Sequence, residues 1–158
     1  MPSETDLAPF NVFNFRVDFS EDGLGDQGSG APVPLCSGAF SECTGLEATM
    51  EPKVIKEGGR NYGVNQRAGP VTFATVILKR GMTTTRHLWK WFDLVGNGAY
   101  AYRLTATITM LDGEGSPVLS WELDKCLPVK FKAADLNARN NEVAIEELHL
   151  AHEGLRLA

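Results

Sequence analysis

YRLTATITML (residues 102–111), DGEGSP (112–117) and VLSWEL (118–123) together form the stretch of sequence that decides the fold class. Apolar and polar side chains alternate along its two outer parts, the period of two expected for a strand with one buried face. The glycine-containing turn between them is typical of a hairpin. The sequence therefore predicts two antiparallel strands that bury one face. The polar positions of the first strand are Arg103, Thr105, Thr107 and Thr109.

A second alternating segment lies near the start of the chain, in FNVFNFRVDF (residues 10–19). Its apolar side chains share one face, which predicts a strand. Residues 21–34 follow and are rich in glycine, acidic residues and proline, with no periodicity. Such a composition predicts a flexible loop inserted in the domain. The apolar face of the strand is formed by Phe13, Phe15, Val17 and Phe19.

Two more β segments are predicted in the middle of the chain. KVIKEGGRNYG (residues 53–63) places Gly58 and Gly59 after a short apolar run, which predicts a tight hairpin, because glycine adopts positive φ angles without steric cost. VTFATVILKRG (residues 71–81) is apolar on both faces. That pattern predicts a central strand covered from both sides.

The stretch LKRGMTTTRHLWKWF (residues 78–92) mixes basic and aromatic residues, which suits a nucleic-acid surface, a membrane-lying helix or a helix packed on a sheet. A membrane-surface helix has a strongly basic polar face, whereas this flank carries mixed charge. Its apolar residues recur at the spacing of one helical stripe, which favours packing on a sheet. We expect Thr84 or Thr85 to cap the helix and Trp89 to lie off the stripe. The stripe consists of Leu88, Trp91, Phe92 and Val95.

The C-terminal segment NNEVAIEELHLAHEGL (residues 140–155) is ambiguous. Val143 and Ile145 share one face of a strand, but Leu148 and Leu150 have the opposite parity. Either a β-bulge resets the phase or the segment is a helix. Periodicity alone leaves both open.

Composition limits the class of protein. The chain has 158 residues, 43% of them hydrophobic and 22% charged, which is ordinary for a single soluble domain spanning residues 1–158. It has neither a run long enough to span a bilayer nor a signal peptide, so we expect it to remain in the cytoplasm where it is made. Its net charge of −5 disfavours stable nucleic-acid binding. Cys36, Cys43 and Cys126 lack metal-site spacing and are expected to be buried or half-buried thiols.

The sequence gives little sign of catalytic chemistry. It contains no phosphate-binding loop, no nucleophile elbow and no zinc-protease motif. His149 and His152 would face opposite sides of a strand, and the neighbouring Glu146 and Glu147 would diverge. We therefore expect no enzyme activity, no catalytic residue, no metal site and no cofactor.

Two long blocks of the chain resemble the phage tail tube family typified by the T4 tube protein, in its contractile-injection-system members. One is EGGRNYGVNQRAGPVTFATVILKRGMTTTRHLWKWF (residues 57–92), with a Glu-Gly-Gly hairpin, a Leu-Lys-Arg-Gly strand end and a Leu-Trp-x-Trp helix. The other is LPVKFKAADLNARNNEVAIEELHLAHEGLRL (residues 127–157). The resemblance covers nearly the whole chain, and the insert at residues 21–34 departs from the family's pattern.

This resemblance implies a mainly β, Hcp-like fold: an antiparallel β-barrel or sandwich with one flanking α-helix. It also implies that the C-terminal segment is a strand with a bulge. Family members form hexameric rings that stack into an inner tube inside a contractile sheath and carry effectors. The implied partners are further copies of the chain, sheath, baseplate or spike and cap proteins, and protein effectors in the lumen. The implied location is cytoplasmic assembly followed by incorporation in a phage-tail-like particle, without membrane insertion by the monomer.

Three sets of residues acquire expected roles in such a tube. The stripe of the helix packs against the sheet, and the polar positions of the 102–111 strand, Arg103, Thr105, Thr107 and Thr109, face the lumen. Lys79, Arg80 and Lys90 should lie outside the lumen. The alternative is a monomeric β-sandwich that binds nucleic acid or carbohydrate. The expected interface between copies consists of Lys53, Val54, Ile55, Lys56, Glu57, Gly58, Gly59 and Arg60.

Overall fold

The computed structural model describes residues 14–21, 32–59, 62–81, 87–98, 103–139 and 142–157. Its elements are, in chain order, β1 (Asn14–Glu21), β2 (Pro32–Ala39), β3 (Glu42–Thr44), β4 (Ala48–Met50), β5 (Lys53–Ile55), β6 (Asn65–Arg67), β7 (Val71–Phe73), β8 (Val76–Gly81), α1 (His87–Gly96), β9 (Leu104–Leu111), β10 (Pro117–Lys132), β11 (Ile145–Ala151) and β12 (Gly154–Leu157). The part of the chain described here contains one helix, and it is too short to cross a membrane.

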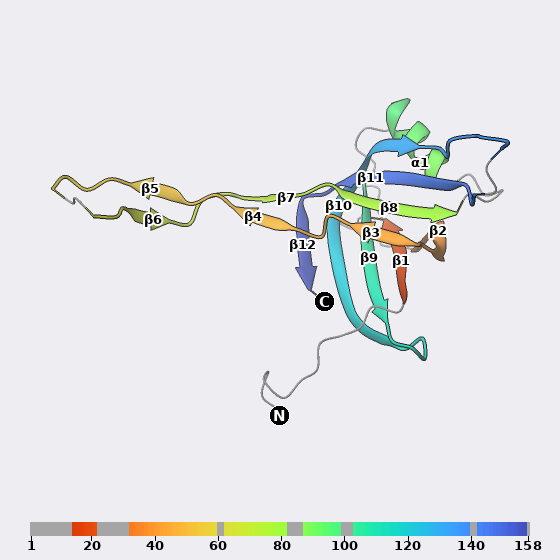
Figure 1. Ribbon diagram of the computed structural model, residues 1–158, viewed down its shortest axis with the longest axis horizontal. Helices are drawn as coiled ribbons and strands as arrows, with labels where there is room; N and C mark the ends of the chain where they lie inside the picture. The colour runs from red at the N-terminus through yellow and green to blue at the C-terminus, as the bar shows by residue number, and fades with distance from the viewer. Residues whose placement is uncertain are drawn as a thin grey trace.

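Strand β10 joins two layers of antiparallel sheet. Its first half pairs with β9 on one side and β12 on the other, and its second half pairs with β11. The full order is β2-β1-β9-β10-β11-β8-β3, and Figure 1 shows the β8, β11 and β3 strands crossing those of the other layer. The turn from one layer to the other occurs at Lys125, whose φ is 51° and which lies within a register shift between Leu123 and Cys126. This architecture confirms the antiparallel sandwich or barrel that the family resemblance implies.

The predicted hairpin at residues 102–123 is confirmed as β9 and β10. Their register places Ile108 opposite Trp121 and Ala106 opposite Leu123, so the apolar positions of both strands share a face. Asp112 shapes the turn, because its Oδ1 accepts hydrogen bonds from the backbone N–H groups of Glu114 and Ser116. Tyr102, which the sequence also assigns to the apolar face, lies outside the described residues.

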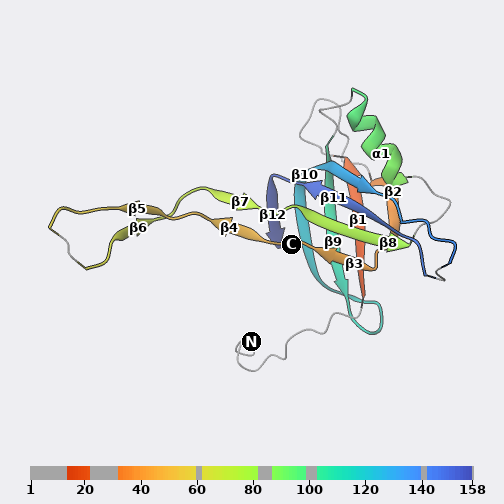
Figure 2. The ribbon, with the colours of Figure 1, turned by 45° about the horizontal axis from the view of Figure 1, so that its top comes forward.

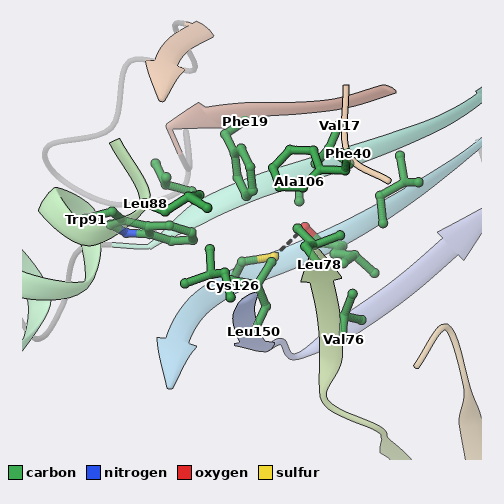
Figure 3. Packing of buried hydrophobic residues seen from close by; sticks show 14 of the residues in the cluster. Val17, Phe19, Phe40, Val76, Leu78, Leu88, Trp91, Ala106, Cys126 and Leu150 are labelled. Carbon is green, nitrogen blue, oxygen red and sulfur yellow. Dashed lines mark hydrogen bonds between the residues drawn. The ribbon is translucent and has the colours of Figure 1, made fainter. Parts of the chain in front are cut away.

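The hydrophobic core fills the space between the two layers, and Figure 3 shows its packing from close by. β1 contributes Val17 and Phe19, as its alternation predicts, and Phe15 packs against them partly buried. Cys43 is half-buried and Cys126 fully buried, both as free thiols. Burial raises the pKa of Cys43 to about 11 and that of Cys126 to about 12. Both therefore stay protonated and unreactive near neutral pH.

Helix α1 covers one end of this core. Leu88, Trp91 and Val95 are buried, and Trp91 makes an edge-on contact with Phe19 of β1, with ring centroids 5.3 Å apart. Phe92, the remaining residue of the predicted stripe, is only half-buried and stacks on Trp89. The candidate capping residues Thr84 and Thr85 lie outside the described residues.

The segment at residues 71–81 is not the single, doubly covered strand that its apolar pattern suggests. It divides into β7, which leaves the body of the protein, and β8, which lies between β3 and β11. Val76, Leu78 and Arg80 of β8 face the core, whereas Ile77 and Lys79 are only half-buried on the other side. The prediction was wrong because the apolar residues belong to two different environments joined end to end.

The C-terminal segment is a strand, but the expected bulge does not lie in it. β11 runs without a register shift along β8, and the shift lies in its other partner, between Pro128 and Lys130 of β10. Leu148 and Leu150 are buried, whereas Val143 and Ile145 are exposed. The conflict in parity disappears because Val143 and Ile145 do not belong to the core.

Two sequence predictions for the N-terminal region fall partly outside the described residues. Phe13 precedes them, and residues 22–31 of the glycine-rich insert are not described. Both flanks of that insert lie in strands, since β1 includes Glu21 and β2 begins at Pro32. β2 pairs with β1 and forms one edge of the layer.

The two tryptophans of α1 offer a matched test of this packing. We expect Trp91→Ala to lower the free energy of unfolding by about 3–5 kcal/mol, because it leaves a cavity in the core. Trp89→Ala should lower the free energy of unfolding by only about 1 kcal/mol, through its lost ring contacts, because Trp89 has 47% of its surface exposed. Urea denaturation of both variants measures the difference. Equal losses would show that Trp91 does not anchor the helix.

Candidate functional site

A two-stranded arm projects from the body, and Figures 1 and 2 show it extending well beyond the core. Its base is the β4–β7 pair, in which Met50 lies opposite Val71, and its outer part is the β5–β6 pair. None of the described arm residues from Ala48 to Phe73 belongs to the buried core. The arm therefore contributes little to the folding of the body, and its side chains are available to a partner.

Backbone geometry explains where the arm divides. Two residues separate β4 from β5, whereas three separate β6 from β7, and Pro52 and Pro70 lie in these gaps. Proline has no N–H to continue a ladder. Across the break, the Glu51 N–H donates to the Pro70 carbonyl at 3.1 Å. A Cβ on Gly69 would come within 1.8 Å of the Glu51 carbonyl oxygen, so this crossing needs a glycine.

The base of the arm needs a second glycine. Gly45 has a φ of 91°, and a Cβ there would lie 2.2 Å from the Thr75 carbonyl oxygen. The strands leaving the body are therefore closer together than any residue with a side chain allows. These two positions fix the direction in which the arm leaves the body.

The arm exposes both apolar and basic side chains. Met50 and Val71 are exposed at its base. Val54 lies nearer the tip and is 54% exposed. Lys53 and Arg67 lie directly opposite one another across the β5–β6 ladder. Like charges in that position destabilise a strand pair. The outer arm thus combines exposed apolar side chains with a pair of like charges. Contact with another copy of the chain could bury the first and offset the second.

The predicted interface residues all fall on this outer arm, except that Arg60 lies outside the described residues. Lys53, Val54, Lys56 and Glu57 are exposed and Ile55 is half-buried. The hairpin is present, but only Gly59 of the two predicted turn glycines has a positive φ, at 85°. The Glu57 carboxylate accepts a hydrogen bond from the side chain of Asn65, which links the two strands near the tip.

The second notable surface is the face of the β1, β9, β10 and β12 strands that points away from the core, here called the polar face. Strand register aligns its residues in rows: Asp18 lies opposite Thr107, Thr107 opposite Glu122, and Glu122 opposite Arg156. Next to this row, Arg16 lies opposite Thr109 and Thr109 opposite Ser120. Four strands therefore combine into one continuous hydrophilic surface.

Charges on the polar face pair with one another. Arg16 bonds to Asp18 at 2.9 Å, and Arg156 reaches both Glu122 and Asp124 at 2.9 Å. Such exposed pairs stabilise the fold by about 1 kcal/mol or less. Their larger consequence is electrostatic, because the face carries little local excess of either sign.

The sequence assigned only four residues to this face. Thr105 and Thr107 lie on it half-buried, whereas Thr109 is buried, and its Oγ1 accepts a hydrogen bond from the Ser120 hydroxyl at 3.3 Å. Arg103 is half-buried just before β9. Sequence reasoning did not assign the charged residues of the neighbouring strands, although their positions alternate with core residues in the same way. Those missed residues are Arg16, Asp18, Glu122, Asp124 and Arg156.

Of the basic residues expected outside a lumen, Arg80 is not at a surface. It is buried on the core side of β8, where its Nε bonds to Glu146 Oε1 at 2.5 Å. Its guanidinium lies 5.7 Å from the centre of the Phe40 ring. Lys79, on the opposite side of β8, reaches Glu42 at 3.5 Å and Glu147 at 3.7 Å. Lys90 is exposed on α1.

The histidines of the C-terminal segment do not converge. His149 lies 3.3 Å from Glu147 Oε2, and this hydrogen bond lowers the pKa of Glu147. His152 turns elsewhere, with its Nδ1 3.0 Å from the Gly154 carbonyl and its ring against Phe73. Among the described residues, no three histidine, cysteine or acidic side chains lie close enough together to hold a metal ion.

Comparison with known proteins shows which family the chain belongs to. The model of the T4-like virus tail tube protein gp19 family matches residues 11–156. The chain belongs to this family. The resemblance seen in the sequence is thereby confirmed, and the match extends over nearly the whole chain. No curated protein sequence matches the chain.

Solved structures with similar folds include tube components. A chain of the anti-feeding prophage (AFP) baseplate, 6-fold symmetrised, is 25% identical with a TM-score of 0.74, covering 96% of this chain and 97% of that one. A chain of the PVC extracellular contractile injection system sheath-tube complex is 17% identical with a TM-score of 0.74, covering 100% and 99%. The Hcp1 protein of Escherichia coli EAEC 042 is 14% identical with a TM-score of 0.51, covering 92% and 90%. The last two likenesses concern the fold alone, and the likeness to Hcp1 confirms that the fold is Hcp-like.

Two glycines of the arm provide a matched pair for testing its geometry. We expect Gly69→Ala to push the two strands apart at the Glu51 carbonyl and to accelerate amide hydrogen exchange from Lys53 to Ile55. The melting temperature should not change, because the arm lies outside the core. Gly58→Ala meets no atom within 4 Å and serves as the control. Equal exchange in both variants would contradict the required close approach.

Proposed function

We propose that this tail tube protein forms hexameric rings that stack into the inner tube of a contractile injection system. The observation that carries the proposal is the arm, which exposes apolar and basic side chains well away from the core of its own chain. An element of this kind gains most from burial against another copy. The 6-fold symmetrised AFP baseplate, with its 25% identical chain, supports six copies in a ring.

The polar face suits the lining of the lumen. A channel wall must remain wetted and must not retain what passes through it. The threonines and paired charges of this face present no exposed apolar patch and little net charge, so they offer neither hydrophobic nor strong electrostatic adhesion. Passage of protein effectors through such a lumen is the function that this surface supports best.

Free strand edges allow this face to continue from copy to copy. Among the strands that the structure describes, β2 ends the layer on one side, and β12 pairs only with β10 on the other. Unpaired edges are open to pairing with another chain. If β2 of one copy adjoins β12 of the next, the polar faces merge into one closed wall.

The outer surface and the ends of the tube would meet other proteins. Similar structures come from a sheath-tube complex, a baseplate and a cap. We infer the same classes of partner for this chain, with assembly in the cytoplasm and incorporation into a phage-tail-like particle. The role is structural, not enzymatic, and needs no cofactor.

Removing the outer arm tests the proposal. We replace residues 51–70 with Asn-Gly, a two-residue turn that can close the β4–β7 ladder. The parent chain should form six-fold rings or tubes by electron microscopy. The shortened chain should sediment as a monomer with an unchanged melting temperature, because no core residue is removed. Tubes of normal length from the shortened chain would contradict a role for the arm in assembly.

Charge pairing on the polar face predicts weak adhesion of nucleic acid. Assembled tubes should bind no DNA in a gel-shift titration between about 50 and 200 mM salt, a range over which several phosphate contacts change affinity by about 10³-fold or more. Asp18→Asn combined with Glu122→Gln leaves Arg16 and Arg156 less compensated and should produce salt-sensitive binding. Steeply salt-dependent binding by the parent would instead favour a nucleic-acid-binding module.

A further inference from the structure

A groove of about 900 Å³ lies on the outer side of the β3–β8–β11 layer, beneath the segment that joins β10 to β11. Its floor is one row of four charged residues in strand register: Glu42 opposite Lys79, Lys79 opposite Glu147, and Glu147 opposite Lys132. Two acidic and two basic side chains alternate along this row. The floor is therefore close to electrically neutral.

The rim of the groove is acidic and apolar. Asp135 and Glu142 line it, and neither forms an ion pair with any residue that the structure describes. Leu136 is 92% exposed and Val143 79% exposed beside them. Large aliphatic side chains next to unpaired carboxylates form a surface suited to a partner that is both apolar and basic.

The outer arm has this complementary chemistry. Lys53 and Arg67 face each other on one side of the ladder, and Lys56 follows at the tip end, without an ion pair to the described residues. Val54 is exposed on the other side. Carboxylates placed near Lys53 and Arg67 would offset the repulsion between these two cations.

The arm and the groove lie at opposite ends of the molecule. In Figures 1 and 2 the arm leaves one side of the body, while the β10–β11 connection extends from the other. An arm cannot fold back into the groove of its own chain from that position. Contact between two different surfaces of neighbouring copies is head-to-tail, an arrangement that forms a ring when the rotation between copies closes.

We propose that the outer arm of one copy docks in the groove of the neighbouring copy. Lys53 and Arg67 then meet Asp135 and Glu142, and Val54 meets Leu136 and Val143. This inference rests on the proposed tube assembly and adds to it the identity of the surface that receives the arm.

Charge reversal on each side tests the docking. The arm variant carries Lys53→Glu and Arg67→Glu, which retains a like-charge pair across the ladder. The groove variant carries Asp135→Lys and Glu142→Lys. We expect each variant alone to raise the critical concentration for assembly by about tenfold or more, equivalent to about 1.4 kcal/mol. An equimolar mixture should assemble like the parent, because each acidic element then meets a basic one.

The control carries Lys90→Glu and Lys130→Glu, the same change of net charge as in the arm variant, at exposed positions outside the arm and the groove. It should assemble like the parent. Recovery in the mixture also shows that both variants are folded. Normal assembly of the groove variant alone, or a mixture that stays unassembled, would overturn the docking. Failure of the parent itself to oligomerise would instead overturn the proposed tube and the docking with it.

Discussion

The bend in β10 at Lys125 is the constraint on which the rest of the structure depends. Several contacts converge there: the Glu153 N–H donates to the Asp124 carbonyl at 3.0 Å, and Gly154 lies close against the Asp124 side chain. The left-handed backbone of Lys125 costs about 1–2 kcal/mol in a residue with a Cβ. The bend lets one continuous strand take part in both layers, which brings β12 to the polar face and β11 to the groove.

The fold was largely predictable where the pattern of the sequence reflects one environment. β1, β9 and the first half of β10 each alternate along one buried face, and the helix stripe marks its packing side. The prediction of one doubly covered strand at residues 71–81 was wrong because an arm strand and a core strand adjoin there without a change in hydrophobicity. The prediction for Val143 and Ile145 was wrong because exposed apolar residues look the same in sequence as apolar residues of the core.

The candidate surfaces were predictable only in part. The hairpin containing Gly58 and Gly59 is a local feature, so its position could be derived from turn chemistry. The remainder of the polar face depends on which strands become neighbours, and a single sequence does not state that order. Arg80 shows the same limit, since nothing around it in the sequence indicates that Glu146, 66 residues away, lies beside it in the core.

No described residue of the arm belongs to the buried core of the body, and this separation has an evolutionary consequence. Core positions are restricted by packing, so most substitutions there lower stability. Arm positions such as Lys53 and Arg67 are not restricted in that way and can diverge without loss of the fold. If the arm docks in the groove of a neighbouring copy as proposed, a cell that makes two kinds of tube could keep them from co-assembling through changes confined to a few residues of the arm and of the groove.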